Sequence, residues 1–162
     1  MLKSELVAAN NFLSDEKLVE LTWGNVSCRS EDENLIYIKP SGVPFEELDE
    51  DNISIITLDG VHVGGLKPSV DTPTHLELYK SFSNIKSVVH THSKYCTIFA
   101  QSKTDIPCLG TTHADYFPSS IKVVPDLSKD QVLGNFEKNT GLAVASFYKE
   151  NNIDYLSERV VL

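Results

Sequence analysis

The run Val88-Val89-His90-Thr91-His92 constrains this chain more than any other stretch of its sequence. β-Branched valines favour a strand, and residues two apart on a strand point to the same face. If the strand continues through His90 and His92, their backbones lie about 6–7 Å apart on one face. Adjacent imidazoles at this spacing suit two ligands on one metal ion. The run therefore predicts a strand that ends in a metal site.

A second motif, residues 67–75, combines a rigid turn with the start of a predicted helix. Pro68 and Pro73 restrict the backbone around Asp71, and proline in the first turn is typical of a helix start. With the histidine pair, Asp71 gives the donor set of a catalytic metal site that keeps a coordination position open. The alternatives are strand histidines that bond backbone carbonyls and an aspartate favoured by the helix dipole.

Length and charge limit the classes of protein and partner. The 162 residues, 41% of them hydrophobic, predict one globular domain, residues 1–162. A net charge of −9 argues against nucleic acid and anionic membranes as partners, so any phosphate must be held by local donors. The three cysteines form no CxxC pair, which favours a reducing, cytoplasmic location. No apolar run reaches transmembrane length.

Periodicity predicts alternating helices and strands. The helices are expected near residues 2–13, 72–83, 94–101, 128–131 and 142–148, and the strands near 22–27, 35–38, 53–58, 61–63, 88–92, 122–124 and 158–162. We expect Thr72 to cap its helix and residues 111–117 to form a loop.

Several turns and loops carry candidate binding or catalytic groups. The turns Gly24-Asn25, Ser41-Gly42 and Pro68-Ser69 follow strands and could offer N–H and hydroxyl donors to a phosphate. Lys39 could add a positive charge there, although a solvated surface lysine is the default. Asp115 could act as an acid or base, and the alternative is a turn aspartate that bonds its own backbone.

The remaining histidines are weaker candidates for a functional role. His113 is a possible ligand, but a structural histidine is the simpler interpretation. We interpret His62 and His75 as structural or surface residues.

Five of these motifs resemble, in the same order, those of the class II aldolase and epimerase family. They are residues 21–27, 38–42, 68–75, 89–93 and 110–117, and the resemblance spans about residues 6–162. It is strongest to the pentulose-phosphate epimerases, because position 71 is aspartate where the related aldolases carry glutamate. The resemblance implies an α/β fold of three layers, with a central, mainly antiparallel sheet flanked by helices.

The resemblance also implies a set of site residues and an assembly. One zinc ion per subunit, with manganese or another divalent ion as an alternative, would bind Asp71, His90 and His92. The implied phosphate pocket consists of Gly24, Asn25, Ser41, Gly42 and Ser69. The implied assembly is a homotetramer with active sites between subunits, where Asp115 of the adjacent subunit is an acid or base and Glu137 lies nearby.

The implied reaction is metal-dependent epimerisation at C4 of a phosphorylated ketopentose, L-ribulose 5-phosphate to D-xylulose 5-phosphate, by retro-aldol and aldol steps. Two departures from the family pattern stand out. Val70 replaces a serine of the phosphate turn, and the chain is expected to lack the family's C-terminal segment with a further zinc histidine and a catalytic tyrosine. The alternatives are a sugar-phosphate aldolase of the fuculose or rhamnulose type and a catalytically dead metal-binding relative.

Overall fold

The computed structural model describes residues 1–31, 34–154 and 160–161. The chain divides into two compact units, Met1–His92 and Ser93–Leu162. The elements of the first unit are α1 (Lys3–Asp15), β1 (Asn25–Arg29), β2 (Leu35–Ile38), η1 (Phe45–Glu47), β3 (Ser54–Thr57), β4 (His62–Gly64), α2 (Thr72–Ser81) and β5 (Ser87–His90). Those of the second are α3 (Lys94–Gln101), α4 (Thr111–Ala114), β6 (Lys122–Val123), α5 (Lys129–Leu133), α6 (Phe136–Glu150) and β7 (Val160–Val161).

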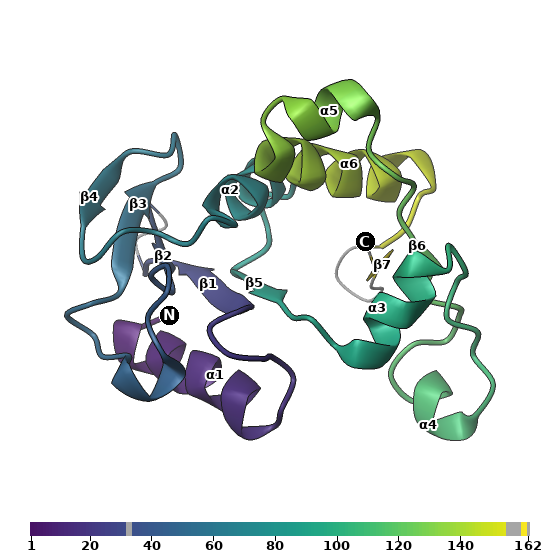
Figure 1. Cartoon of the computed structure of the whole chain (residues 1–162), viewed down its shortest axis with the longest axis horizontal. Coiled ribbons are helices and arrows are strands. Elements are labelled where there is room, and N and C mark those ends of the chain that lie inside the picture. The colour runs from purple at the N-terminus through teal and green to yellow at the C-terminus, as the bar shows by residue number, and fades with distance from the viewer. Residues whose placement is uncertain (32–33, 155–159, 162) are drawn as a thin grey trace. The chain divides into compact units, whose positions relative to one another are not determined.

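The first unit is built on a five-stranded sheet in the order β4-β3-β2-β1-β5 (Figure 1). Every neighbouring pair in this sheet is antiparallel. The edge strand β5 pairs with β1 so that Asn25 lies opposite His90 and Ser27 lies opposite Val88. This register brings the end of the predicted histidine strand beside the predicted Gly24-Asn25 turn.

Helices cover both faces of this sheet, with α1 on one face and α2 on the other (Figure 1). Leu6 and Leu13 of α1 pack with Val26 and Cys28 of β1 in one buried cluster. The second cluster joins the α2 side chains Leu76 and Tyr79 to isoleucines 36, 38 and 56 of β2 and β3. Alternation along a strand sends successive side chains to opposite faces, so Ile36 and Ile38 of β2 face the second cluster while Tyr37 between them packs against the first. The predicted class, an antiparallel sheet flanked by helices, is confirmed.

The second unit is mainly helical, and its strands β6 and β7 pair in parallel. Ser128 caps α5, since its Oγ accepts from the Gln131 N–H at 3.3 Å. Asn135 caps α6 in the same way, accepting from the Lys138 N–H at 3.1 Å. Caps of this kind satisfy N–H groups that have no partner inside a helix.

Some predictions about local structure are wrong. Thr72 is the first residue of α2 rather than its cap; Asp71 occupies the cap position, and the Thr72 hydroxyl donates to the Ser69 carbonyl at 2.6 Å. The predicted loop 111–117 begins with the short helix α4. Strand β5 ends at His90, so His92 does not share a strand face with it. The predicted strand near residues 158–162 lies partly outside the described residues.

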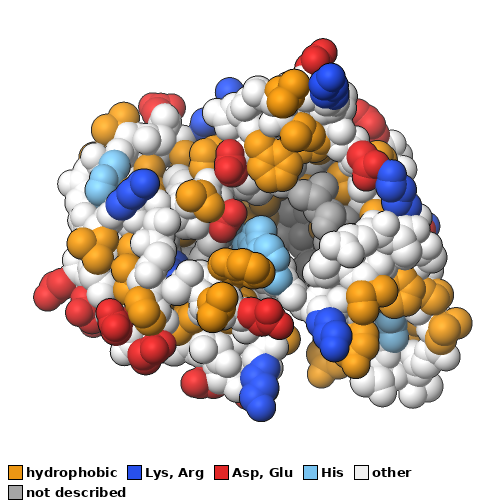
Figure 2. Space-filling model, in the orientation of Figure 1, with side chains coloured by type: hydrophobic (Ala, Val, Ile, Leu, Met, Phe, Trp, Pro, Cys, Tyr) orange, Lys and Arg blue, Asp and Glu red, His pale blue; other side chains and the backbone are white. Residues whose placement is uncertain are grey.

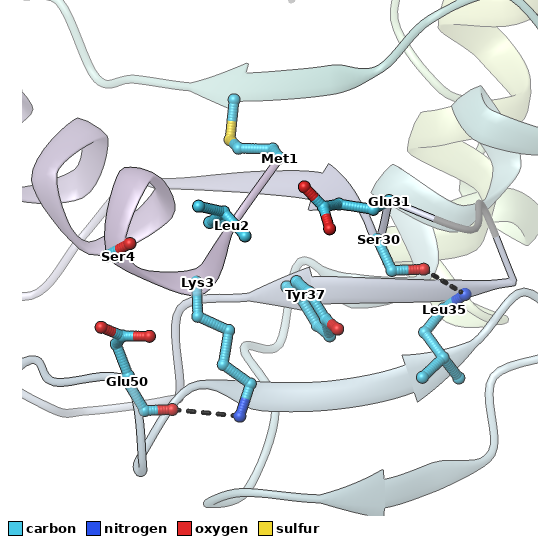
Figure 3. Close-up of a pocket in the computed structure, with 9 residues that line it drawn as sticks. All are labelled: Met1, Leu2, Lys3, Ser4, Ser30, Glu31, Leu35, Tyr37 and Glu50. Carbon is cyan, nitrogen blue, oxygen red and sulfur yellow. Dashed lines mark hydrogen bonds between the residues drawn. The ribbon is translucent and has the colours of Figure 1, made fainter.

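A depression of about 510 Å³ opens near the chain start, between α1 and the strand ends (Figure 3). There Lys3 Nζ donates to the Glu50 carbonyl at 3.1 Å. None of the residues that the sequence predicts for a site lines this depression. No helix in the described part of the chain is long and apolar enough to cross a membrane.

Candidate metal and phosphate site

His90 and His92 converge although they do not share a strand. Their Nε2 atoms lie 2.9 Å apart, and the ring centroids are separated by 4.8 Å. His90 is half-buried at the end of β5, and His92 is exposed just beyond it. The ring of Trp23 lies 5.8 Å from the ring of His92. Histidine side chains reach the surface on the face drawn in Figure 2, beside hydrophobic and acidic ones.

Asp71 is held in place by polar neighbours from other parts of the first unit. Its Oδ2 accepts hydrogen bonds from Asn25 Nδ2 at 2.7 Å and from Ser69 Oγ at 3.2 Å. The same Asn25 amide also donates to Ser69 Oγ at 3.1 Å. Because a carboxylate only accepts, the amide nitrogen of Asn25 must face it. Since Asn25 pairs with His90 across the sheet, it links Asp71 to the histidine pair.

The electrostatics of His90 favour the neutral imidazole. Burial lowers the pKa of His90 below its usual 6.5, and the nearby His92 acts in the same direction. The Asp71 carboxylate acts in the opposite direction. Metal ions bind the neutral form of histidine.

The donor atoms of this cluster suit a divalent ion. Two nitrogens on one tetrahedral zinc, each about 2.0–2.1 Å from the metal, lie about 3.3 Å apart. The Nε2 pair at 2.9 Å is close to that separation. Among the described residues, no three His, Cys, Asp or Glu side chains are already arranged around one point. Asp71 instead keeps its hydrogen bonds with Asn25 and Ser69, so its role as third ligand stays a prediction.

The predicted phosphate turns lie close together in the first unit. Asn25 Nδ2 reaches Ser69 Oγ, and Pro40 and Pro68 form an isolated β-bridge. The N–H of Ser41 donates to the Lys67 carbonyl at 2.9 Å beside this bridge. Gly42 has open space where a side chain would stand, and Val70 is 62% exposed. The turns that contain Asn25, Ser41 and Ser69 are thus joined, while their role in binding phosphate stays a prediction.

Gly24 has a structural role that its sequence context did not reveal. Its φ is +78°, a left-handed conformation that favours glycine. A Cβ at this position would stand 2.8 Å from the His90 carbonyl oxygen and 2.5 Å from Val19 Cγ1. Glycine therefore allows the turn before β1 to approach the end of β5.

Lys39 is buried, contrary to the solvated surface lysine expected by default. Its side chain is 1% exposed. Its Nζ donates to the Val43 carbonyl at 2.6 Å and lies 4.6 Å from the centre of the Phe45 ring. Lys39 thus supports the turn at Ser41-Gly42 from inside, through the backbone that follows the turn.

Replacing Lys39 with methionine is expected to flatten the dependence of stability on alkaline pH. Burial lowers the pKa of Lys39 in the folded chain below its usual 10.5. Between the two values the unfolded chain binds more protons, so the free energy of unfolding rises with pH over that window. Lys39→Met removes this contribution. Urea unfolding from about pH 8.5 to about pH 10.5 measures the slope.

The exposed Lys129 provides the control for this measurement, because Lys129→Met should leave the slope unchanged. Lys39→Met also leaves the Val43 carbonyl without its partner, at a cost of about 1–3 kcal/mol at every pH. Equal slopes for Lys39→Met and the unaltered chain would contradict the prediction.

The remaining predicted residues belong to the second unit. Asp115 is exposed and follows α4, where its N–H donates to the Thr111 carbonyl at 2.8 Å. His113 Nε2 lies 3.1 Å from the Ser119 carbonyl oxygen, which agrees with a structural histidine. Glu137 lies half-buried in the first turn of α6. The roles of Asp115 and Glu137 stay predictions.

Sequence reasoning missed two residues beside the cluster. Trp23 contacts His92, and its place in the Trp23-Gly24-Asn25 motif was the available signal. His75 is 1% exposed and lies on α2 one turn after Asp71, with its ring 6.5 Å from that of His90. Burial lowers the pKa of His75 to about 3, aided by His90 and opposed by Asp71. The sequence left His75 as a structural or a surface residue; it is buried, and its place beside His90 was not predicted.

Comparison with known proteins gives one family. Residues 4–154 match the family described as Class II Aldolase and Adducin N-terminal domain. The chain is 43% identical over 155 residues to a probable L-ribulose-5-phosphate 4-epimerase of Mycoplasma pneumoniae, covering 94% of this chain and 64% of that protein. It is 45% identical over 144 residues to the L-ribulose-5-phosphate 4-epimerase of Salmonella paratyphi C, covering 88% and 63%.

Solved structures agree on the fold. An L-fuculose 1-phosphate aldolase aligns with a TM-score of 0.70 and 23% identity, covering 99% of this chain and 90% of that one. The aldolase of the same name from Thermus thermophilus aligns with a TM-score of 0.71 and 21% identity, covering 92% and 71%. The chain spans less than two thirds of the length of the two epimerases above.

Proposed function

This chain belongs to the class II aldolase and adducin family, and on that basis we propose that it is an L-ribulose-5-phosphate 4-epimerase. The observation that carries the proposal is the 43% and 45% identity with proteins of that name over 94% and 88% of the chain. The two aldolase structures are 23% and 21% identical and support the fold alone. The family resemblance of the sequence also favours the epimerase, because position 71 is aspartate, where the resemblance implies glutamate for most of the related aldolases.

The reaction inverts the configuration at C4 of L-ribulose 5-phosphate and gives D-xylulose 5-phosphate. A base removes the proton of the C4 hydroxyl, the C3–C4 bond breaks, and its electron pair stays on the three-carbon fragment as an enediolate. Glycolaldehyde phosphate rotates in the site, and the same bond forms again on its other face. A general acid then returns the proton to the C4 oxygen.

Asp71, His90 and His92 would hold the metal ion, zinc or another divalent ion such as manganese, one per subunit. When bound, the ion supplies Lewis acidity at the carbonyl and hydroxyl oxygens of the sugar. In this chain Asn25 and Ser69 hold the Asp71 carboxylate in place, and burial lowers the pKa of His90, which favours its neutral imidazole with one ring nitrogen available to a metal ion. These residues therefore prepare the donor set.

We assign phosphate binding to the joined turns, through Gly24, Asn25, Ser41, Gly42 and Ser69. The support is the open space over Gly42 and the contact between Asn25 and Ser69. A phosphate held there would keep glycolaldehyde phosphate from leaving. Retention of this fragment is what distinguishes epimerisation from aldol cleavage.

Asp115 is the proposed acid or base, contributed to the site by a neighbouring subunit of a homotetramer. Its exposed position after α4 leaves the carboxylate accessible to such a partner. Residues 1–162 are proposed to act as one domain, since the family match spans both compact units. The proposed location is the cytoplasm, because the substrate is phosphorylated and Cys28, Cys96 and Cys108 are free thiols.

Conversion of L-ribulose 5-phosphate to D-xylulose 5-phosphate by the zinc-loaded chain tests the proposal. Asp115→Asn is expected to lower the rate about 10²- to 10⁴-fold, the range for loss of a general acid or base. The exposed Asp130 of α5 offers a matched control, because Asp130→Asn should keep the full rate.

Other products would overturn the proposal in different ways. Free dihydroxyacetone and glycolaldehyde phosphate without D-xylulose 5-phosphate would identify an aldolase. Bound zinc with no turnover would identify the catalytically dead metal-binding relative.

A further inference from the structure

Strand β1 carries a buried row of polar side chains on the face that packs against α2. Residues two apart on a strand share a face, so Asn25, Ser27 and Arg29 form this row. All three are buried. His75 and Tyr79, four residues apart on one face of α2, pack against it and are each 1% exposed. Buried polar groups at this density must be hydrogen-bonded to be tolerated.

Ser27 is the centre of this row. Its Oγ lies 2.7 Å from His75 Nδ1 and 2.8 Å from the Tyr79 hydroxyl oxygen. The Tyr79 hydroxyl oxygen also forms a hydrogen bond with the backbone of Val88 on β5. Arg29 holds the other end of the row, since its Nη2 donates to the Tyr79 carbonyl at 2.7 Å and its guanidinium lies 4.9 Å from the ring centre.

Counting protons selects one direction for these hydrogen bonds. Ser27, Tyr79 and neutral His75 each have one side-chain proton, and two hydrogen bonds join them. If Tyr79 donates to Ser27 and Ser27 donates to Nδ1, both hydroxyl protons are used and the His75 proton lies on Nε2. In the reverse direction, His75 Nδ1–H donates to Ser27 and Ser27 donates to Tyr79. The Tyr79 proton then has no acceptor among these groups, and Nε2 is an acceptor without a donor. The first arrangement leaves fewer buried groups unpaired, so it is favoured.

The unpaired atoms lie at the end of the row next to the candidate site. His75 Nε2 and Asn25 Oδ1 are buried and have no hydrogen-bond partner in the described part of the chain. They belong to successive contacts of β1, Asn25 with Asp71 at the cap position of α2 and Ser27 with His75 inside that helix. The His75 ring lies nearly parallel to that of His90, with an interplanar angle of 19°.

We propose that Tyr79 and Ser27 form a hydrogen-bond relay that holds His75 as the Nε2–H tautomer, a positioning residue behind His90. The neutral ring packs beside His90 and adds no positive charge next to the donor set. The positioning role rests on the proposed function, whereas the tautomer does not.

Long-range ¹H–¹⁵N correlation spectra of the histidine-labelled chain at neutral pH test the relay. The chain has five histidines, and the His75 signals are assigned from their loss in His75→Gln. In the unaltered chain we expect His75 to show the cross-peak pattern of the Nε2–H tautomer. Ser27→Ala should replace it with a mixture of both tautomers, and Tyr79→Phe should also admit the second tautomer, because Ser27 can then accept from Nδ1.

Ser54→Ala is the matched control. Ser54 is a fully buried serine of the same sheet, and its Oγ donates to the Leu66 carbonyl at 2.7 Å. This variant should keep the His75 pattern while losing one buried hydroxyl. An Nδ1–H pattern in the unaltered chain, or an unchanged pattern in both Ser27→Ala and Tyr79→Phe, would overturn the relay.

Cobalt(II) binding separates the positioning role from a purely structural one. Ser27→Ala is expected to weaken cobalt binding about 10- to 100-fold and to change the visible spectrum of the bound ion, while Ser54→Ala changes neither. Equal affinity and spectra for the two variants would overturn the positioning role. If the unaltered chain binds no cobalt, the proposed function fails, and the tautomer measurement still decides the relay.

Discussion

His90→Ala is expected to remove bound zinc and to abolish epimerase activity while the chain stays folded. His90 supplies one of two imidazole nitrogens that converge within 2.9 Å. Loss of a direct ligand should weaken metal binding by more than the roughly 10- to 100-fold typical of residues that only support a ligand. Elemental analysis of the purified protein measures the metal content, and circular dichroism checks the fold. His90 is half-buried at a strand end, so its truncation leaves only a small void.

His62→Ala is the control for this experiment. His62 is an exposed histidine of the same sheet, and its Nε2 lies 2.8 Å from the Gly64 carbonyl oxygen. It should retain both zinc and activity. A His90→Ala protein with unchanged zinc content and rate would show that the metal site lies elsewhere. Zinc lost equally from both variants would show surface binding only.

Gly24→Ala is expected to destabilise the first unit by about 2–5 kcal/mol. A left-handed backbone costs a non-glycine residue about 1–2 kcal/mol, and overpacking adds about 1–3 kcal/mol. The new Cβ would meet the His90 carbonyl oxygen at 2.8 Å, and this oxygen belongs to the backbone of a paired strand. Relief of the overlap must therefore move β5 and the histidine on it. Urea unfolding monitored by Trp23 fluorescence gives the free energy.

Gly42→Ala separates the two causes of this effect. Gly42 has φ of +73°, nearly the same as Gly24, but a Cβ there meets no atom within 4 Å. It should therefore show only the backbone cost of about 1–2 kcal/mol. If Gly24→Ala costs no more than Gly42→Ala, the close approach of the Gly24 turn to β5 has no energetic consequence. In the expected case Gly24→Ala also weakens zinc binding, because His90 moves.

The pair His90 and His92 shows how far local patterns can be used. The spacing of the two histidines was sufficient to predict that their side chains meet, but the predicted reason was wrong. Strand β5 ends at His90, and the residues after it turn His92 back so that the Nε2 atoms converge. A two-residue spacing permits this contact both within a strand and just beyond its end. The pattern therefore predicted the contact better than the conformation.

For Lys39 and His75, the local pattern did not predict the contacts that the side chains make. Nothing in their neighbouring residues indicates burial. Lysine is usually solvated, and the helix pattern around His75 is the same whether this histidine is structural or lies on the surface. Burial of Lys39 depends on carbonyls and an aromatic ring that the chain supplies after the following turn. Burial of His75 depends on Ser27, which is 48 residues away in sequence.

The sequence by itself determined the residue types of the candidate site. Its motifs, whose members are close in the chain, also carried the resemblance that implied the family and the antiparallel sheet flanked by helices. Only the tertiary structure decided which groups face one another. The pairing of β1 with β5 places Asn25 opposite His90, and the packing of α2 on β1 buries Ser27 against His75. Such contacts join segments far apart in sequence, and their geometry is set by strand register and helix packing, which no local pattern contains.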